Sequence, residues 1–201
     1  MQESSTRQRL LDAALSLVWG NSYGSVGVDE ICQLADVKKG SFYHAFKSKS
    51  DLATAAFEYY WEQKRPHYDQ LFSPLLPPLE RLNGYCKLIV DDQKQKHKLG
   101  GKVLGCPFNS VGCELSTQDE NVRQKARELS NRVVKYIESA VRDLMEEGLI
   151  EVADAAELAK EIYAYSAGVV TQAKIDNDIK SVERIAPGIC RLLGVKTLLN
   201  P

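Results

Sequence analysis

The sequence predicts an all-α protein of about nine helices arranged in two domains. Apolar residues recur at spacings of three and four along nearly the whole chain, and no stretch shows a convincing strand alternation. Capping residues precede several of these periodic stretches, and glycine or proline follows them. No internal repeat or low-complexity tract interrupts this pattern.

The first three helices are expected to be short and close together. The first is expected over residues 6–20, where one face carries Leu10, Ala13, Ala14, Leu17 and Val18. A turn follows, and the second helix, over 28–35, is expected to bury Ile31, Leu34 and Ala35. Asp36 begins a tight turn into a third helix over 38–45.

A longer fourth helix is expected over residues 48–72. Ser48 and Asp51 have the spacing of a capping box, with aspartate in the place usually taken by glutamate. Pro66 lies inside this stretch and is expected to kink or end the helix.

The Ser-Pro-Leu-Leu-Pro-Pro run after the fourth helix is the clearest break in the chain. We therefore expect an N-terminal domain over 1–47 and a C-terminal domain over 48–201, with the fourth helix as the connection. Five further helices are expected, over residues 79–98, 108–116, 117–147, 155–176 and 181–194. Thr117, with an acid three residues on, and Asp154 are the expected N-caps. Pro187 is expected to bend the last helix or delay its start.

The stretch 28–51 points most specifically to a partner. Two short helices joined by a tight turn, the second bearing lysines, a phenol and an imidazole, are the layout of a helix-turn-helix that presents one helix to a DNA major groove. The stretch from Val37 to Asp51 contains four lysines and one carboxylate, so its local formal charge is +3, whereas the net charge of the whole chain is −1. The candidate DNA-binding residues are Lys38, Lys39, Ser41, Tyr43, His44 and Lys49.

These candidates have different expected roles. Lys39 and Ser41 lie early on the second short helix, where base edges are within reach. Tyr43 and His44 are placed for backbone phosphates, and Lys49 is offered to a phosphate from the first turn of the next helix. The alternative is a small three-helix unit with a solvated lysine face.

Residues 6–60 resemble the DNA-binding domain of the TetR family of bacterial transcriptional regulators. The resemblance is carried by Ile31 and by the run Ala-Asp-Val-Lys-Lys-Gly-Ser-Phe-Tyr-His-Ala-Phe-Lys-Ser-Lys-Ser-Asp-Leu that begins at Ala35. The family usually has glycine where Asp36 stands, although aspartate tolerates a left-handed turn. Lys38 and Gly27 stand where the family usually has serine or threonine at a helix start; the loss at Lys38 weakens that cap by about 1 kcal/mol.

The resemblance implies a homodimer that binds a palindromic operator near its own promoter and acts as a repressor released by a small ligand. It places dimerisation on the helices expected over 155–176 and 181–194, for whose apolar stripes ordinary core packing is the alternative. Two recognition helices would then lie about 34 Å apart, or a multiple of it.

The C-terminal half resembles the branch of the family that includes the N-ethylmaleimide-reductase repressor, in its Gly-Cys at Cys106 and its Gln-Ala-Lys-Ile around Lys174. Several members of that branch respond to electrophiles or oxidants through a cysteine. Cys106 is expected at a helix N-terminus, which lowers a thiol pKa, with Lys174 as a possible nearby cation. The alternative for Cys106 is a small buried residue at a helix start. Candidate residues for a ligand pocket are Tyr85, Ile89, Phe108, Tyr136, Tyr163 and Tyr165; ordinary core packing is the alternative for each.

Composition narrows the remaining classes. No apolar run is long enough to span a membrane, and the N-terminus does not read as a signal peptide, so a cytoplasmic protein with free thiols is expected. The three histidines are far apart, so no metal site is expected, and no cofactor motif is present. The alternatives to a DNA-binding regulator are a thiol-dependent enzyme, using Cys106 or Cys113 with His67 or His97 as base, and a helical scaffold that does not bind DNA.

Overall fold

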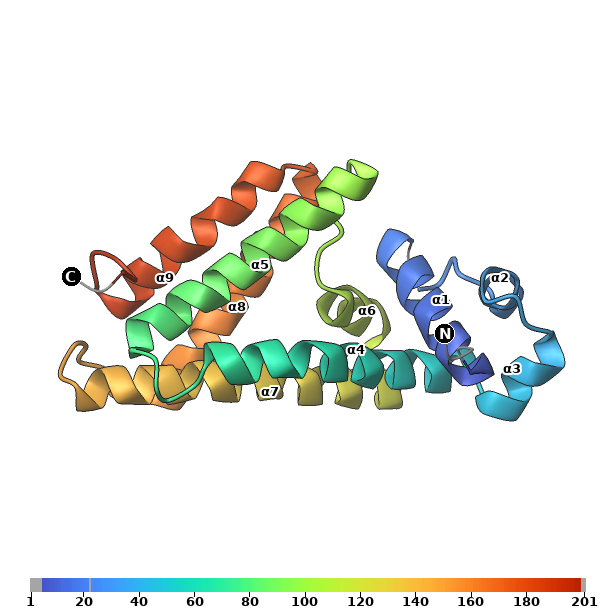
Figure 1. Ribbon diagram of the computed structural model, residues 1–201, viewed down its shortest axis with the longest axis horizontal. Helices are drawn as coiled ribbons and strands as arrows, with labels where there is room; N and C mark the ends of the chain where they lie inside the picture. Colours follow the sequence, from blue (N-terminus) through green and yellow to red (C-terminus); the bar gives the residue numbers. More distant parts are fainter. Residues whose placement is uncertain (1–4, 22, 200–201) are drawn as a thin grey trace. The chain divides into compact units, whose positions relative to one another are not determined.

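The computed structural model describes residues 5–21 and 23–199 (Figure 1). Within these ranges the chain has nine α-helices, one 3₁₀ helix and no strand, which confirms the predicted all-α class. The helices are α1 Thr6–Gly20, α2 Val28–Leu34, α3 Lys39–Ala45, α4 Lys49–Leu71, α5 Pro78–Gly100, α6 Pro107–Leu115, α7 Glu120–Glu146, α8 Ala155–Asp176, η1 Ile179–Arg184 and α9 Ile185–Leu193. No described helix is long and apolar enough to cross a membrane.

Contacts divide the chain into two compact units. The first comprises residues 1–64 and 106–129, and the second comprises 65–105 and 130–201. This division differs from the predicted boundary at residue 47, because α6 and the first turns of α7 group with the N-terminal helices. Helices α4 and α7 each contribute residues to both units. The boundary at 47 stays a prediction about which residues read DNA.

The three N-terminal helices share one hydrophobic core. Its fully buried members include Leu10, Ile31, Phe42 and Leu52. Leu34, expected inside, is 53% exposed at the last position of α2, so that expectation was wrong. The helical stripe shifts at the helix end, where the chain turns away from the core.

The turn between α2 and α3 has the geometry that the sequence predicted. Asp36 adopts a left-handed conformation with φ of 50°, which aspartate tolerates better than most residues. Its amide donates to Gln33 O at 3.2 Å, and the Val37 amide donates to Cys32 O at 3.0 Å, which together make a Schellman motif. Arg9 of α1 donates to Asp36 O at 3.0 Å and so ties the turn to the first helix.

The predicted caps had mixed outcomes. The cap at Ser48 is confirmed, because Ser48 Oγ accepts from the Asp51 amide at 3.0 Å. The Asp51 carboxylate reaches back as in a capping box, but it accepts from the Lys47 amide, one residue before Ser48, at 3.0 Å. The cap of α7 is Asp119, which accepts from the Val122 amide at 3.1 Å, so the expectation at Thr117 was wrong. Aspartate one residue before the helix offers a better placed acceptor than a threonine three residues before it.

The two prolines inside predicted helices had different outcomes. Helix α4 runs through Pro66 to Leu71 without ending there. The segment expected as a helix over 181–194 is η1 followed by α9, which begins only at Ile185, so the predicted delay of the helix start is confirmed. Pro187 lies in the first turn of α9, where no intrahelical N–H is required. By contrast, α8 has the predicted bounds and Asp154 caps it, accepting from the Ala156 amide at 2.8 Å.

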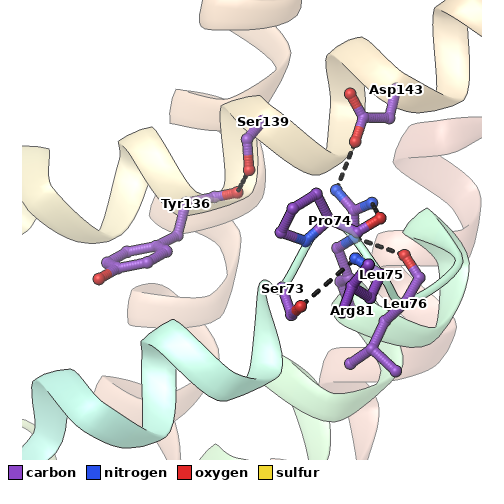
Figure 2. A network of polar contacts seen from close by, with 8 residues as sticks. All are labelled: Ser73, Pro74, Leu75, Leu76, Arg81, Tyr136, Ser139 and Asp143. Carbon is purple, nitrogen blue, oxygen red and sulfur yellow. Dashed lines mark hydrogen bonds and ion pairs between the residues drawn. The ribbon is translucent and has the colours of Figure 1, made fainter.

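In the second unit a buried arginine holds the α4–α5 turn. Arg81 of α5 is 4% exposed, and its guanidinium donates to Leu76 O at 2.7 Å and to Pro74 O at 3.2 Å. It also forms an ion pair with Asp143 of α7, as Figure 2 shows. One side chain therefore satisfies two turn carbonyls and one carboxylate.

Candidate nucleic-acid interface

Helix α3 is held by its aromatic residues. Phe42 is fully buried, and its ring lies 6.2 Å from that of Phe46 and 5.1 Å from that of Tyr43, measured between centroids. Because Phe42 and Phe46 are four residues apart, both rings anchor the same face of the helix in the core. The opposite face is left to solvent.

That outer face carries the residues predicted to contact DNA. All five candidates from the start and body of α3 are exposed: Lys38, Lys39, Ser41, Tyr43 and His44. Lys38 occupies the N-cap position and makes no side-chain cap, as the sequence predicted. The structure thus gathers polar side chains along the exposed face of one short, well-anchored helix. Lys38, Lys39 and Ser41 lie at its N-terminal end, where a recognition helix presents side chains to base edges.

Lys39 is ion-paired with Asp29 of α2 at 2.8 Å. The hydrogen bond and the charge of that carboxylate raise the pKa of Lys39. The pair links the first turns of the two helices, and because an ammonium has three donors, it leaves capacity for a second acceptor.

Lys49 does not lie with the other candidates. Its ammonium donates to Tyr23 O at 2.7 Å and to Val26 O at 2.8 Å, and lies 3.9 Å from the centroid of the Tyr23 ring. Burial lowers the pKa of Lys49. These described contacts hold the carbonyls that precede α2, and the expectation that Lys49 is offered to a phosphate stays a prediction.

Two features of this face were missed from the sequence. Gly40, in the first turn of α3, is exposed, and a Cβ there would meet nothing within 4 Å. Glycine weakens a helix, and no contact within the described chain requires its small size at this point. Lys47 is also exposed, directly after the helix, and its position beside the lysine-rich run was the available signal.

The candidate sensor residues are divided between the two units. Cys106 is partly exposed at the N-cap of α6, as predicted. Phe108, in the same unit, packs edge-on against Phe57 at 5.2 Å and Tyr60 at 5.4 Å between centroids. These contacts account for Phe108 as packing of α6 on α4.

In the second unit the candidate tyrosines have partners of their own. Tyr136 donates to Asp69 and packs against Phe72 at 5.4 Å; burial, then that hydrogen bond, raises the pKa of Tyr136 to about 12. Tyr165 donates to Arg184 O at 3.0 Å, and its ring occupies the space beside Gly188, where a Cβ would clash. Lys174 is partly buried in the last turn of α8. Among the described residues no cluster of His, Cys, Asp or Glu could hold a metal.

The fold and this face define a helix-turn-helix DNA-binding protein. Two family models match the chain: the N-terminal model of the bacterial regulatory proteins of the tetR family over residues 10–56, and the tetracycline-repressor-like C-terminal domain over residues 78–189. The chain therefore belongs to the TetR family of transcriptional regulators, and it is a DNA-binding regulator and not an enzyme.

Individual relatives agree with this assignment. The transcriptional regulator AcuR of Cereibacter sphaeroides is 35% identical over 121 residues, which are 60% of this chain and 53% of AcuR, so the chain spans about half of that relative's length. The repressor NemR of Escherichia coli is 25% identical over 187 residues, 90% of each chain. The structure of TetR from Rhodobacter sphaeroides matches with a TM-score of 0.80 and 26% identity, covering 93% of this chain and 98% of that one.

Proposed function

We propose that this chain is a repressor that binds a palindromic operator near its own promoter as a homodimer and is released by a small effector or an electrophile. The observation that carries the proposal is the exposed polar face of α3 over the buried Phe42. Lys39 and Ser41 would contact base edges, while Lys38, Tyr43 and His44 would contact phosphates. Because its proposed partner is DNA, the protein would act in the cytoplasm.

Selective binding to DNA tests this proposal. Duplexes would be selected from a random pool by the wild-type protein at about 150 mM salt, where non-specific attraction is weak. Enrichment of an inverted repeat is expected. Enrichment of no sequence, with binding that falls steeply with salt, would show electrostatic attraction alone and would contradict the proposal.

The proposed dimer face lies on α8, together with α9. The exposed residues Ala164, Gly168, Thr171 and Ile175 recur at helical spacing on one side of α8, and Ile175 is 71% exposed. Small residues on this face allow a helix of a second copy to approach closely, and the exposed apolar surface favours contact with that copy.

Gly168 offers a clean test, because a Cβ there would meet nothing within 4 Å of the same chain. Gly168→Arg is expected to produce a folded monomer by sedimentation. Gly100→Arg, at a position with equally open space on α5, is the control and is expected to stay dimeric. A dimeric Gly168→Arg would move the interface elsewhere.

We propose Cys106 as the thiol through which an electrophile releases DNA. It occupies the N-cap position of α6 without a side-chain cap hydrogen bond, next to first-turn amides that favour a thiolate, and it is partly exposed. A neighbouring solved structure, with a TM-score of 0.81 and 23% identity over 94% of this chain and 96% of that one, is described as the reduced form of E. coli NemR. Cys113, exposed on the same helix, is the competing thiol. Burial raises the pKa of Cys86 to about 12, which makes that thiol unreactive.

Thiol titration of the native protein with N-ethylmaleimide decides between them. Mass spectrometry is expected to find Cys106 modified first, with loss of operator binding that Cys106→Ser prevents and Cys113→Ser does not. Equal rates at Cys106 and Cys113, or binding unchanged by modification, would move the search to a non-covalent effector.

A further inference from the structure

The α1–α2 turn, described over residues 23–27, is held by a carboxylate from a distant part of the chain. Glu114 of α6 accepts from the Tyr23 amide through Oε2 at 3.0 Å and from the Gly24 amide through Oε1 at 2.7 Å. Each carboxylate oxygen has its own backbone donor. Because the acceptor group is a carboxylate, both hydrogen bonds are charge-assisted. Ninety-one residues separate Glu114 from Tyr23 in the sequence.

The same turn is held on its carbonyls by Lys49 of α4. Its ammonium accounts for two carbonyls, those of Tyr23 and Val26, at 2.7 and 2.8 Å. A carboxylate thus holds the amides of the α1–α2 turn while an ammonium holds its carbonyls. The phenol of Tyr23 lies in this charged setting, and burial, followed by the charges of Asp119 and Glu114, raises the pKa of Tyr23 to about 12.

The helix that carries Glu114 is itself firmly seated. Phe108 packs against Phe57 and Tyr60 of α4. One helical turn further on, a Cβ at Gly112 would lie 3.0 Å from Ala126 Cβ on α7, which shows how closely α6 and α7 approach. Glu114 is therefore offered to the turn from a fixed position and not from a mobile segment.

The turn needs this hold because α2 begins without a cap of its own. Its N-cap is Gly27, which has no side chain to accept a first-turn amide. Where α2 begins determines where Asp29 lies, and Asp29 pairs with Lys39 at the start of α3. A shift of the α1–α2 turn would therefore move the start of the recognition helix.

We propose that Glu114 is a positioning residue for operator binding, which sets the helix-turn-helix by holding the amides of Tyr23 and Gly24. This inference rests on the proposed function as an operator-binding repressor. It assigns to α6, the helix that begins at the proposed sensor Cys106, direct control over the start of α2.

Glu114→Gln tests the proposal, because glutamine keeps the shape but replaces one acceptor oxygen by a donor that faces a backbone amide. Glu114→Asp is the second variant: it keeps the charge and withdraws the oxygens from the turn. Glu120→Gln is the matched control, since Glu120 lies at the start of α7 and pairs with the exposed Arg123. Each protein is first checked for folding by circular dichroism and urea unfolding.

The readouts are affinity for the duplex selected by the wild type, affinity for a scrambled duplex, and the dependence of both on salt. Loss of one charge-assisted hydrogen bond predicts about a tenfold weaker operator binding for Glu114→Gln, with scrambled-duplex binding unchanged. The salt slope for the operator is expected to fall as phosphate contacts are lost. Hydrogen exchange of the Tyr23 and Gly24 amides should accelerate in both variants, and Glu120→Gln should bind within twofold of wild type.

Each outcome has one meaning. Folded Glu114 variants with faster exchange at the turn but wild-type operator affinity and salt slope would overturn the proposal and leave Glu114 a stabilising residue only. If Glu114→Gln unfolds, the Glu114→Asp result decides by the same criteria; if both unfold while Glu120→Gln does not, Glu114 is required for folding and the positioning role is overturned. A wild type that selects no sequence would contradict the proposed function and not this step.

Discussion

The recognition face of α3 and the two turns held by charged side chains use positive charge in opposite ways. On α3, Lys38 and Lys39 point to solvent from a helix anchored by Phe42. Lys49 donates to backbone carbonyls of the α1–α2 turn, and Arg81 donates to backbone carbonyls of the α4–α5 turn. A lysine-rich stretch is therefore not one surface: exposed cations are available to a partner, while cations bonded to carbonyls stabilise the chain's own turns.

The largest loss of stability is expected at Arg81, the more buried of the two cations that donate to turn carbonyls. Arg81→Met keeps the aliphatic stem but leaves two turn carbonyls and the Asp143 carboxylate without their donor. We expect a loss of about 3 kcal/mol in the free energy of unfolding, measured by urea denaturation. Arg142→Met, which removes an exposed pair with Glu138, is the control and should change it by less than about 1 kcal/mol. If Arg81→Met lowered the unfolding free energy no more than Arg142→Met, cations bonded to turn carbonyls would not differ from exposed cations in their effect on stability.

Substitutions on the exposed face of α3 should change operator binding but not the free energy of unfolding. Lys39→Ala with Tyr43→Ala is expected to weaken operator binding by about 100-fold, because each side chain contributes a separate DNA contact. The unfolding free energy should stay within about 0.5 kcal/mol of wild type, since both side chains are exposed. Operator binding that survives this double substitution would return the lysine face to a merely solvated surface.

Lys49→Met sharpens the comparison, because the sequence groups this lysine with the outward ones. Methionine can still cover the Tyr23 ring but cannot donate to the carbonyls of Tyr23 and Val26. We expect a loss of about 1–2 kcal/mol in the free energy of unfolding. An unchanged stability, with a salt slope for DNA lowered by about one, would instead identify Lys49 as a phosphate contact.

The smallest effect concerns Gly40. Gly40→Ala should stabilise the fold by about 0.5–1 kcal/mol, because alanine favours helix and the space is open. Operator binding should nevertheless weaken, since the added methyl faces the partner. Gly100→Ala, at a helical position with equally open space, is expected to leave binding unchanged. Improved stability with unchanged binding at Gly40 would show that DNA does not approach there.

Helix positions and the helix-turn-helix were determined by the sequence alone, because periodicity and most caps act within a few residues. The left-handed Asp36, the Ser48 cap and the Asp154 cap are such local features. The sequence also determined that α3 presents polar residues outward, because Phe42 and Phe46 fix which face of the helix is buried. The cap at Asp119 was missed because two acceptors compete within three residues, and the geometry of the preceding turn decides between them.

Only the tertiary structure decided which charges face a partner and which face the chain. Lys49 and Tyr23 are 26 residues apart, and Glu114 and Tyr23 are 91 apart, so no local pattern reveals their hydrogen bonds. The same holds for Tyr165, whose ring fills the space left by Gly188. Side-chain chemistry is written in the sequence, but a side chain's role depends on the atoms that folding places within hydrogen-bond distance of it.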